Sequence, residues 1–177
     1  MGRSNAEWEE LKRFRAEVHF ERGRALFRNR KFAEALAAFD EALRQDGSFL
    51  RAEIARAYAL KRLGRPDEAL ASAARAIAGD PRAGLAYAAR ASIYQDLGRR
   101  AEAEADFARA IALSPDEPRV YYNFACFWAH EGNEEKCREH LGRALELDPQ
   151  SNSVAAVDED FADFREKPWF LALVAFK

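Results

Sequence analysis

The stretch LRAEIARAYALKRLGRPDEALASAARAIAGDPRA, residues 50–83, decides the fold, because its pattern returns along the chain at a spacing of 34 residues. The recurring positions are a glycine (Gly64, Gly98 and Gly132), a proline (Pro81, Pro115 and Pro149) and an alanine (Ala42, Ala76, Ala110 and Ala144). A branched aliphatic residue follows each of these alanines. A fixed period sustained along the chain indicates a repeat protein.

Cutting the chain at this period gives four units without insertions: 16–49, 50–83, 84–117 and 118–151. In each unit, small and large residues recur at helical spacing in two blocks. The small columns are Gly23, Ala57, Ala91 and Ala125, then Ala35, Ala69, Ala103 and Cys137. Each unit is therefore predicted to be a helix, a turn and a second helix. The glycine supplies a left-handed turn, and the proline ends the second helix. In the first unit, Arg30 stands in the glycine position and Gly47 in the proline position.

The period, the alanine and aromatic columns and the terminal prolines resemble the tetratricopeptide repeat over residues 16–151. This resemblance implies an all-α, right-handed superhelical α-solenoid whose first helices line a concave face. It also implies a non-catalytic protein–protein interaction module or an assembly scaffold.

The two ends of the chain are predicted to be helical additions to the repeats. Residues 1–15 extend the first helix, which we expect to begin near Ala6, and residues 152–177 form a cap with a helix starting near Pro168. The pattern from Asp160 to Phe170 looks like the closing segment of a group of bacterial tetratricopeptide repeat proteins. An alternative is that the extension, through Trp8, or the cap mediates self-association. A strict monomer in light scattering over a concentration range would contradict this alternative.

The resemblance also assigns a candidate partner-binding groove to five positions of each first helix. The candidates are Phe20, Arg24, Phe27, Arg28, Arg51, Ile54, Tyr58, Lys61, Arg62, Gln95, Arg119, Tyr122, Cys126 and His130. The first two units contribute five basic residues against one acid, Glu17, with apolar residues between them. This pattern favours a peptide that carries acidic groups and one or two apolar anchors. The alternative is a solvated basic face, or one that pairs with the acidic tail of the chain itself.

One subtype of the family binds the C-terminal carboxylate of heat-shock chaperones through a clamp of Lys, Asn and Arg spread over three units. The clamp positions hold Phe20, Arg24, Ala55, Leu85 and Ala89 in one register, and Ile54, Tyr58, Ala89, Arg119 and Asn123 in the next. Neither register keeps the pattern, so we predict that the clamp is absent. Tight binding of an EEVD-type peptide would contradict this prediction.

The stretch CFWAHEGNEEKCREH, residues 126–140, contains the ligand types of a zinc site: Cys126, His130, Cys137 and His140. The repeat register separates them. Cys126 and His130 fall on the groove side of a first helix, whereas Cys137 falls in a small, buried column of a second helix. We therefore predict no metal and no cofactor. No histidine has a serine and carboxylate arranged as a triad, and no phosphate-binding glycine loop is present, so an enzyme is not predicted.

The composition limits the partner and the compartment. The formal net charge of −2 gives no strong field toward nucleic acid or an anionic membrane, so protein partners are favoured. Single-stranded nucleic acid in the arginine-rich groove remains an alternative, and the absence of binding at low salt would remove it. Two cysteines and the lack of a long apolar stretch lead us to expect a cytoplasmic protein.

Overall fold

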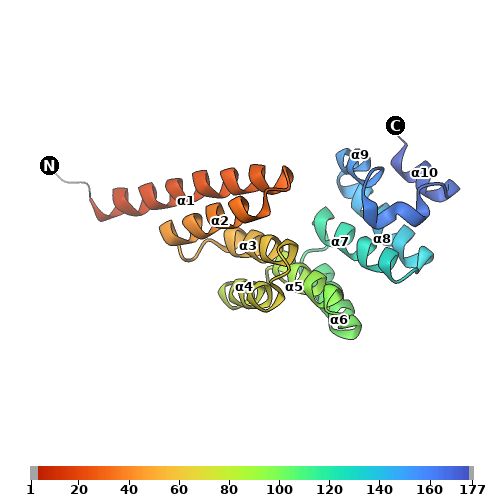
Figure 1. Ribbon diagram of the computed structural model, residues 1–177, viewed down its shortest axis with the longest axis horizontal. Coiled ribbons are helices and arrows are strands. Elements are labelled where there is room, and N and C mark those ends of the chain that lie inside the picture. Colours follow the sequence, from red (N-terminus) through yellow and green to blue (C-terminus); the bar gives the residue numbers. More distant parts are fainter. Residues whose placement is uncertain (1–3, 176–177) are drawn as a thin grey trace.

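Successive helix pairs joined by tight turns build the chain, and the computed structural model describes residues 4–175 (Figure 1). The pairs are α1 (Asn5–Arg28) with α2 (Phe32–Gln45), α3 (Leu50–Arg62) with α4 (Pro66–Gly79), α5 (Gly84–Asp96) with α6 (Arg100–Leu113), and α7 (Pro118–His130) with α8 (Glu134–Leu147). Each helix packs most extensively on the other member of its pair, and α1, α3, α5 and α7 also contact one another in succession. The predicted all-α solenoid is confirmed.

The turns between paired helices have the conformation that the glycines predict. Gly64, Gly98 and Gly132 have φ values of 68°, 68° and 67°, in the left-handed region. Arg30 has a φ of 60° at the equivalent place in the first pair. A residue with a Cβ atom is strained in this region, so the first turn carries a cost that the other three avoid.

Replacing Arg30 with glycine should therefore stabilise the protein. We expect Arg30→Gly to raise the free energy of unfolding by about 0.5–1 kcal/mol, because the strain relieved exceeds the added entropy of the unfolded chain. Urea unfolding followed by circular dichroism measures this change. Gly64→Ala is the matched control and should lower the free energy of unfolding, since nothing lies within 4 Å of its new methyl group and only strain is added. An Arg30→Gly variant no more stable than the parent would contradict this account.

The small columns allow the paired helices to approach closely. Ala35, Ala69, Ala103 and Cys137 are fully buried. Helices α1 and α2 also approach closely at Gly23, because a Cβ atom there would lie 2.5 Å from Cε1 of Phe39. The small residues are thus explained by backbone proximity, as the repeat pattern predicts.

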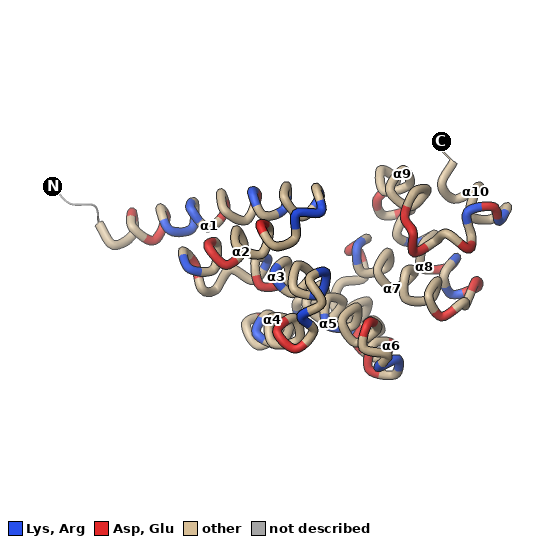
Figure 2. The backbone as a smooth tube through the Cα atoms, viewed as in Figure 1, with Lys and Arg blue, Asp and Glu red and all other residues tan. Residues whose placement is uncertain are grey.

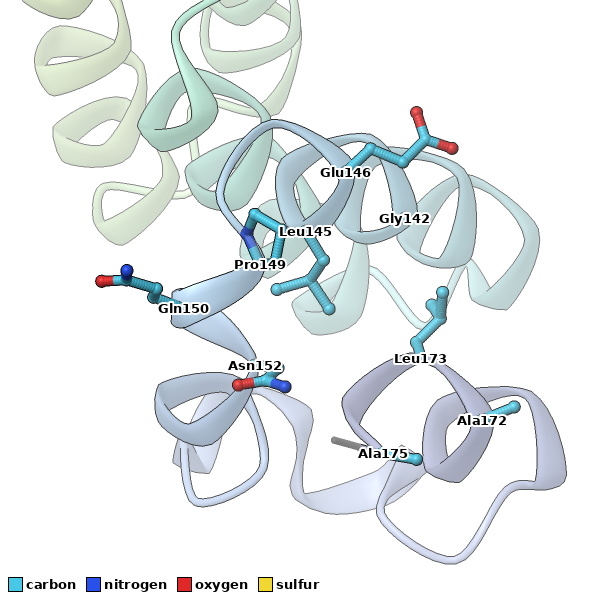
Figure 3. A pocket seen from close by; sticks show the side chains of 9 residues that line it. All are labelled: Gly142, Leu145, Glu146, Pro149, Gln150, Asn152, Ala172, Leu173 and Ala175. Carbon is cyan, nitrogen blue, oxygen red and sulfur yellow. The ribbon is translucent and has the colours of Figure 1, made fainter. Parts of the chain in front are cut away.

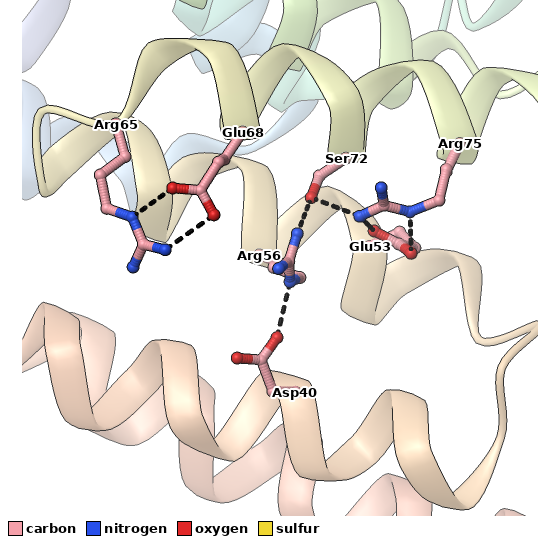
Figure 4. Close-up of polar contacts among 7 residues, drawn as sticks. All are labelled: Asp40, Glu53, Arg56, Arg65, Glu68, Ser72 and Arg75. Carbon is pink, nitrogen blue, oxygen red and sulfur yellow. Dashed lines mark hydrogen bonds and ion pairs between the residues drawn. The ribbon is translucent and has the colours of Figure 1, made fainter.

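A second set of contacts recurs within the units, between residues 16 positions apart. Arg56 donates from Nη1 to Oγ of Ser72 at 2.5 Å, and also from Nε to Oδ1 of Asp40 at 2.6 Å, which ties the second pair to the first (Figure 4). In the third pair, Arg90 donates to both carboxylate oxygens of Asp106 at 2.6 and 2.9 Å.

In the fourth pair the equivalent contact is a stack of two aromatic rings. The rings of Phe124 and His140 stack with centroids 4.4 Å apart and an interplanar angle of 27°. His140 therefore has a packing role at a repeat position.

Both ends of the chain are helical, as expected. Helix α1 begins at Asn5, where Ser4 and Glu7 form a capping box, one residue before the predicted start. Its first turns extend past α2 (Figure 1). Further along the helix, Phe14 and Val18 are exposed.

After α8 come η1 (Pro149–Ser151), α9 (Asn152–Ala155), η2 (Glu159–Phe164) and α10 (Pro168–Val174), which starts at the predicted Pro168. Phe161 and Phe170 of this segment are buried. Within residues 4–175, no helix combines the length and the apolar composition that crossing a membrane requires.

Candidate functional site

Three adjoining cavities lie along the first helices of the pairs, with volumes of about 450, 170 and 630 Å³. Phe27 of α1 and Tyr58 of α3 line all three, and Tyr122 and Asn123 of α7 line the two larger ones. We call these three cavities together the groove. Its walls come from different units, so its shape depends on how the helix pairs stack.

All but two of the candidate groove residues line these cavities. Those that do are Arg24, Phe27, Arg28, Ile54, Tyr58, Lys61, Arg62, Gln95, Arg119, Tyr122, Cys126 and His130. Phe20 is buried and packs against Phe39 and Phe49. Arg51 donates to both carboxylate oxygens of Glu17 at 2.6 and 2.8 Å and covers the ring of Phe20. Neither Phe20 nor Arg51 lines any of the three cavities.

Sequence reasoning missed several residues that do line the groove. Four of them bear on the chemistry of the groove: Asn123, Val154, Asp158 and Asp160. Asn123 lies on a first helix, one place beyond a groove position. The other three come from the segment after α8, whose path around α7 has no counterpart in the repeat pattern. The only feature of the sequence that could have pointed to these three residues is the acidic run at 158–160.

The floor of the groove is aromatic and carries hydrogen-bonding groups. Asn123 donates from Nδ2 to the hydroxyl oxygen of Tyr58 at 2.8 Å. Burial raises the pKa of Tyr58, so its hydroxyl stays protonated. Phe27 packs edge-on to Phe32 with centroids 5.2 Å apart and is itself only half-buried. The floor can therefore take an apolar side chain and offer a neutral polar group beside it.

The basic residues of the groove differ in how far they are already paired. Lys61 pairs with Asp96 at 3.2 Å, Arg24 with Glu21 at 2.9 Å, and Arg119 with Glu117 at 2.9 Å.

Two exposed groove arginines have no such partner. Within the described residues 4–175, neither Arg28 nor Arg62 forms an ion pair; Arg62 instead lies over the ring of Phe32, 4.8 Å from its centroid. These two arginines are available to an acidic ligand.

The fourth unit is engaged by the chain's own C-terminal segment. The hydroxyl of Tyr122 donates to Oδ2 of Asp158 at 2.7 Å, and Nε2 of His130 lies 3.1 Å from Oδ1 of Asp160. Burial, with the nearby carboxylates of Asp160 and Asp158, holds the pKa of the Cys126 thiol well above its usual range. The acidic segment thus lies at the α7 end of the groove, and within residues 4–175 it forms no ion pair with Arg28 or Arg62 of the first two units.

The four residues of the zinc-like stretch do not come together. Cys137 is fully buried in its small column, and His140 stacks on Phe124. Among residues 4–175, the group whose ligand atoms do converge is Cys126, Asp158 and Asp160, within 4.8 Å of one another. Both oxygens of Asp158 already accept hydrogen bonds, from the Tyr122 hydroxyl and the Asp160 N–H, and Asp158 is the N-cap of η2.

A further cavity of about 650 Å³ lies between α8 and α10 (Figure 3). Leu145 and Leu173 face it, and Gly142 lies on its α8 side. Among the lining residues within 4–175, Glu146 is the one that carries a charge. None of the candidate groove residues reaches this cavity. Few polar groups converge on this cavity, so it offers a ligand fewer orienting contacts than the groove does.

Comparison with known proteins identifies the repeat. The tetratricopeptide repeat family model matches residues 9–48, 20–84, 54–118 and 88–152, which together span most of the chain. No curated protein matches the chain.

Several solved structures share the fold. A thermophilic tetratricopeptide repeat protein of Thermus thermophilus superposes with a TM-score of 0.71 at 21% identity, covering 89% of this chain and 87% of that one. The tetratricopeptide repeat domain of Arabidopsis OM64 gives 0.58 at 25% identity, with 73% and 98% covered. The first such region of Spaghetti (RPAP3), bound to the HSP90 peptide SRMEEVD, gives 0.56 at 22% identity, with 76% and 93% covered.

Proposed function

Because the chain belongs to the tetratricopeptide repeat family, we propose that it is a non-catalytic interaction module whose groove binds an acidic peptide segment of a partner protein. The observation that carries this proposal is the pair of arginines without ion-pair partners within residues 4–175, Arg28 and Arg62, beside the floor formed by Phe27 and Tyr58. One face of the partner segment would place a large apolar side chain on this floor. The carboxylates of the partner segment would pair with the two arginines.

Two features support a peptide as the ligand. The groove runs across several first helices, a length that suits an extended or helical segment. A related fold, the Spaghetti region, was solved with an HSP90 peptide bound. The residues of the heat-shock clamp are replaced in this chain, so a different acidic sequence is proposed as the partner. The same groove would serve an assembly scaffold if the segment belongs to a larger complex.

Reversing the two free charges tests this function. A fluorescein-labelled peptide, Glu-Glu-Gly-Trp-Leu-Gly-Gln-Gln, is titrated with the protein, and fluorescence anisotropy gives Kd. The double variant Arg28→Glu, Arg62→Glu should bind at least about tenfold more weakly, because two attractions become repulsions. A peptide with glutamines in place of its glutamates should lose affinity for the parent protein but show little response to the double variant.

The matched control keeps the same change in net charge outside the groove. Arg15 and Arg109 are exposed, and neither forms an ion pair within residues 4–175. Arg15→Glu with Arg109→Glu should leave Kd nearly unchanged at physiological salt, where distant charges are screened. Equal losses in the two double variants would show a general charge effect and contradict the proposed site.

A further inference from the structure

Charges of opposite sign line a single cavity of the groove. The 630 Å³ cavity is lined by Arg62 and by Asp158 and Asp160, with Phe27 and Tyr58 also in its wall. Arg28 lies in the neighbouring cavity that shares both aromatic residues. The free positive charges belong to α1 and α3, whereas the two carboxylates belong to the segment beside α7. The charge of the groove therefore changes sign across its aromatic floor.

Within the described part of the chain, no lysine or arginine neutralises the negative end. Asp158 accepts from the Tyr122 hydroxyl and from a backbone N–H, which are both neutral donors. Asp160 contacts His130 at 3.1 Å.

Two cations near this end are engaged elsewhere: Arg165 pairs with Glu159 at 3.2 Å and Lys61 pairs with Asp96 at 3.2 Å. Among residues 4–175, neither Asp158 nor Asp160 forms an ion pair with a lysine or an arginine. A purely acidic ligand that reached this end would be repelled.

From this arrangement, and resting on the proposed function, we propose that the groove selects a partner segment of mixed charge. Its acidic residues would bind at Arg28 and Arg62. Its large apolar residue would lie on Phe27 and Tyr58. A lysine or arginine beyond the apolar residue would pair with Asp158 and Asp160. Asp158 and Asp160 then determine specificity, because they favour a partner segment with a basic residue at one end and disfavour a uniformly acidic segment.

A segment of a protein fits these features better than a metal ion does. A cation on Cys126, Asp158 and Asp160 would satisfy the negative end only, and it would compete with hydrogen bonds that Asp158 already accepts. A segment with acidic residues, then an apolar residue, then a basic residue can contact both charged ends of the groove and the aromatic floor between them. Such complementarity contributes mainly to selectivity between partners.

A double-mutant cycle between protein and peptide tests the mixed-charge proposal. The mixed peptide is Glu-Glu-Gly-Trp-Leu-Gly-Lys-Lys, and the reference is the same peptide with glutamines replacing both lysines. Kd is measured by anisotropy for the parent protein, for Asp160→Asn and for Asp163→Asn, in buffer containing EDTA. Asp163 is exposed in the same 3₁₀ helix and lines none of the groove cavities, so it is the matched control.

The mixed peptide should bind the parent protein about threefold or more tighter than the reference peptide. Asp160→Asn should remove most of this preference by weakening the mixed peptide more than the reference peptide, and Asp163→Asn should preserve it. Binding of both peptides with equal affinity, or an equal effect of Asp160→Asn on both, would overturn the mixed-charge proposal and leave the acidic-peptide function standing. Failure of both peptides to bind would overturn both. The lysine-to-glutamine change tests the same contact without altering the protein.

Discussion

Replacing Phe161 with alanine is expected to lower the free energy of unfolding by about 3–5 kcal/mol, the usual cost of removing a buried phenylalanine side chain. Phe161 is fully buried, with its ring 5.6 Å from that of Tyr122 and 5.8 Å from that of Phe170, centroid to centroid. It therefore joins α7 of the last repeat to α10 of the C-terminal segment. Urea unfolding followed by circular dichroism measures the loss.

The control for this variant lies in the same segment. Leu171 is about half exposed on α10, so Leu171→Ala should cost less than about 1 kcal/mol. The comparison tests the proposal that residues 152–177 cap the last repeat. A Phe161→Ala variant as stable as Leu171→Ala would show that the segment does not stabilise the repeats, and a role as a partner-binding tail would then be favoured.

Replacing Phe27 with alanine is expected to weaken binding of the acidic test peptide by roughly thirtyfold, or about 2 kcal/mol, the size typical of an aromatic residue at the centre of an interface. Phe27 is partly buried and, together with Tyr58, lines all three cavities of the groove. Its removal takes away the floor on which the apolar anchor of the peptide would pack. Anisotropy titration with the Glu-Glu-Gly-Trp-Leu-Gly-Gln-Gln peptide gives the change in Kd.

Phe14 provides the matched control on the same helix. Its side chain is 65% exposed on α1 and lines none of the three groove cavities. Phe14→Ala should therefore leave peptide affinity unchanged. If Phe14→Ala weakened binding more than Phe27→Ala, the extension and not the groove would be the docking surface.

Much of the fold follows from the 34-residue period. The glycines at 64, 98 and 132 predicted left-handed turns, and all three have φ near +68°. The small columns predicted close helix contacts, and they are buried. These features depend on neighbours within one repeat, so the local pattern determines them. Figure 2 shows that charged residues of both signs are spread along the helices, and this distribution gives no comparable signal for a binding surface.

The candidate site was less predictable because its side chains meet across units. Arg51 and Glu17 occupy the same position of successive repeats, and their ion pair turns Arg51 away from the groove cavities. Lys61, which does line the groove, pairs with Asp96 of the next unit. Such contacts depend on the rotation between stacked pairs, which the period does not give. Asp158 and Asp160 reach the groove only because the C-terminal segment folds back on α7.

The most direct test of the central claim is to map where the peptide binds. The ¹⁵N-labelled protein is titrated with the acidic test peptide, and amide chemical shifts are followed in ¹H–¹⁵N correlation spectra. The groove proposal predicts the largest shifts in residues 24–28 and 54–62, on the facing parts of α1 and α3. Shifts confined to residues 8–15 of the extension, or to 168–174 of α10, would contradict it.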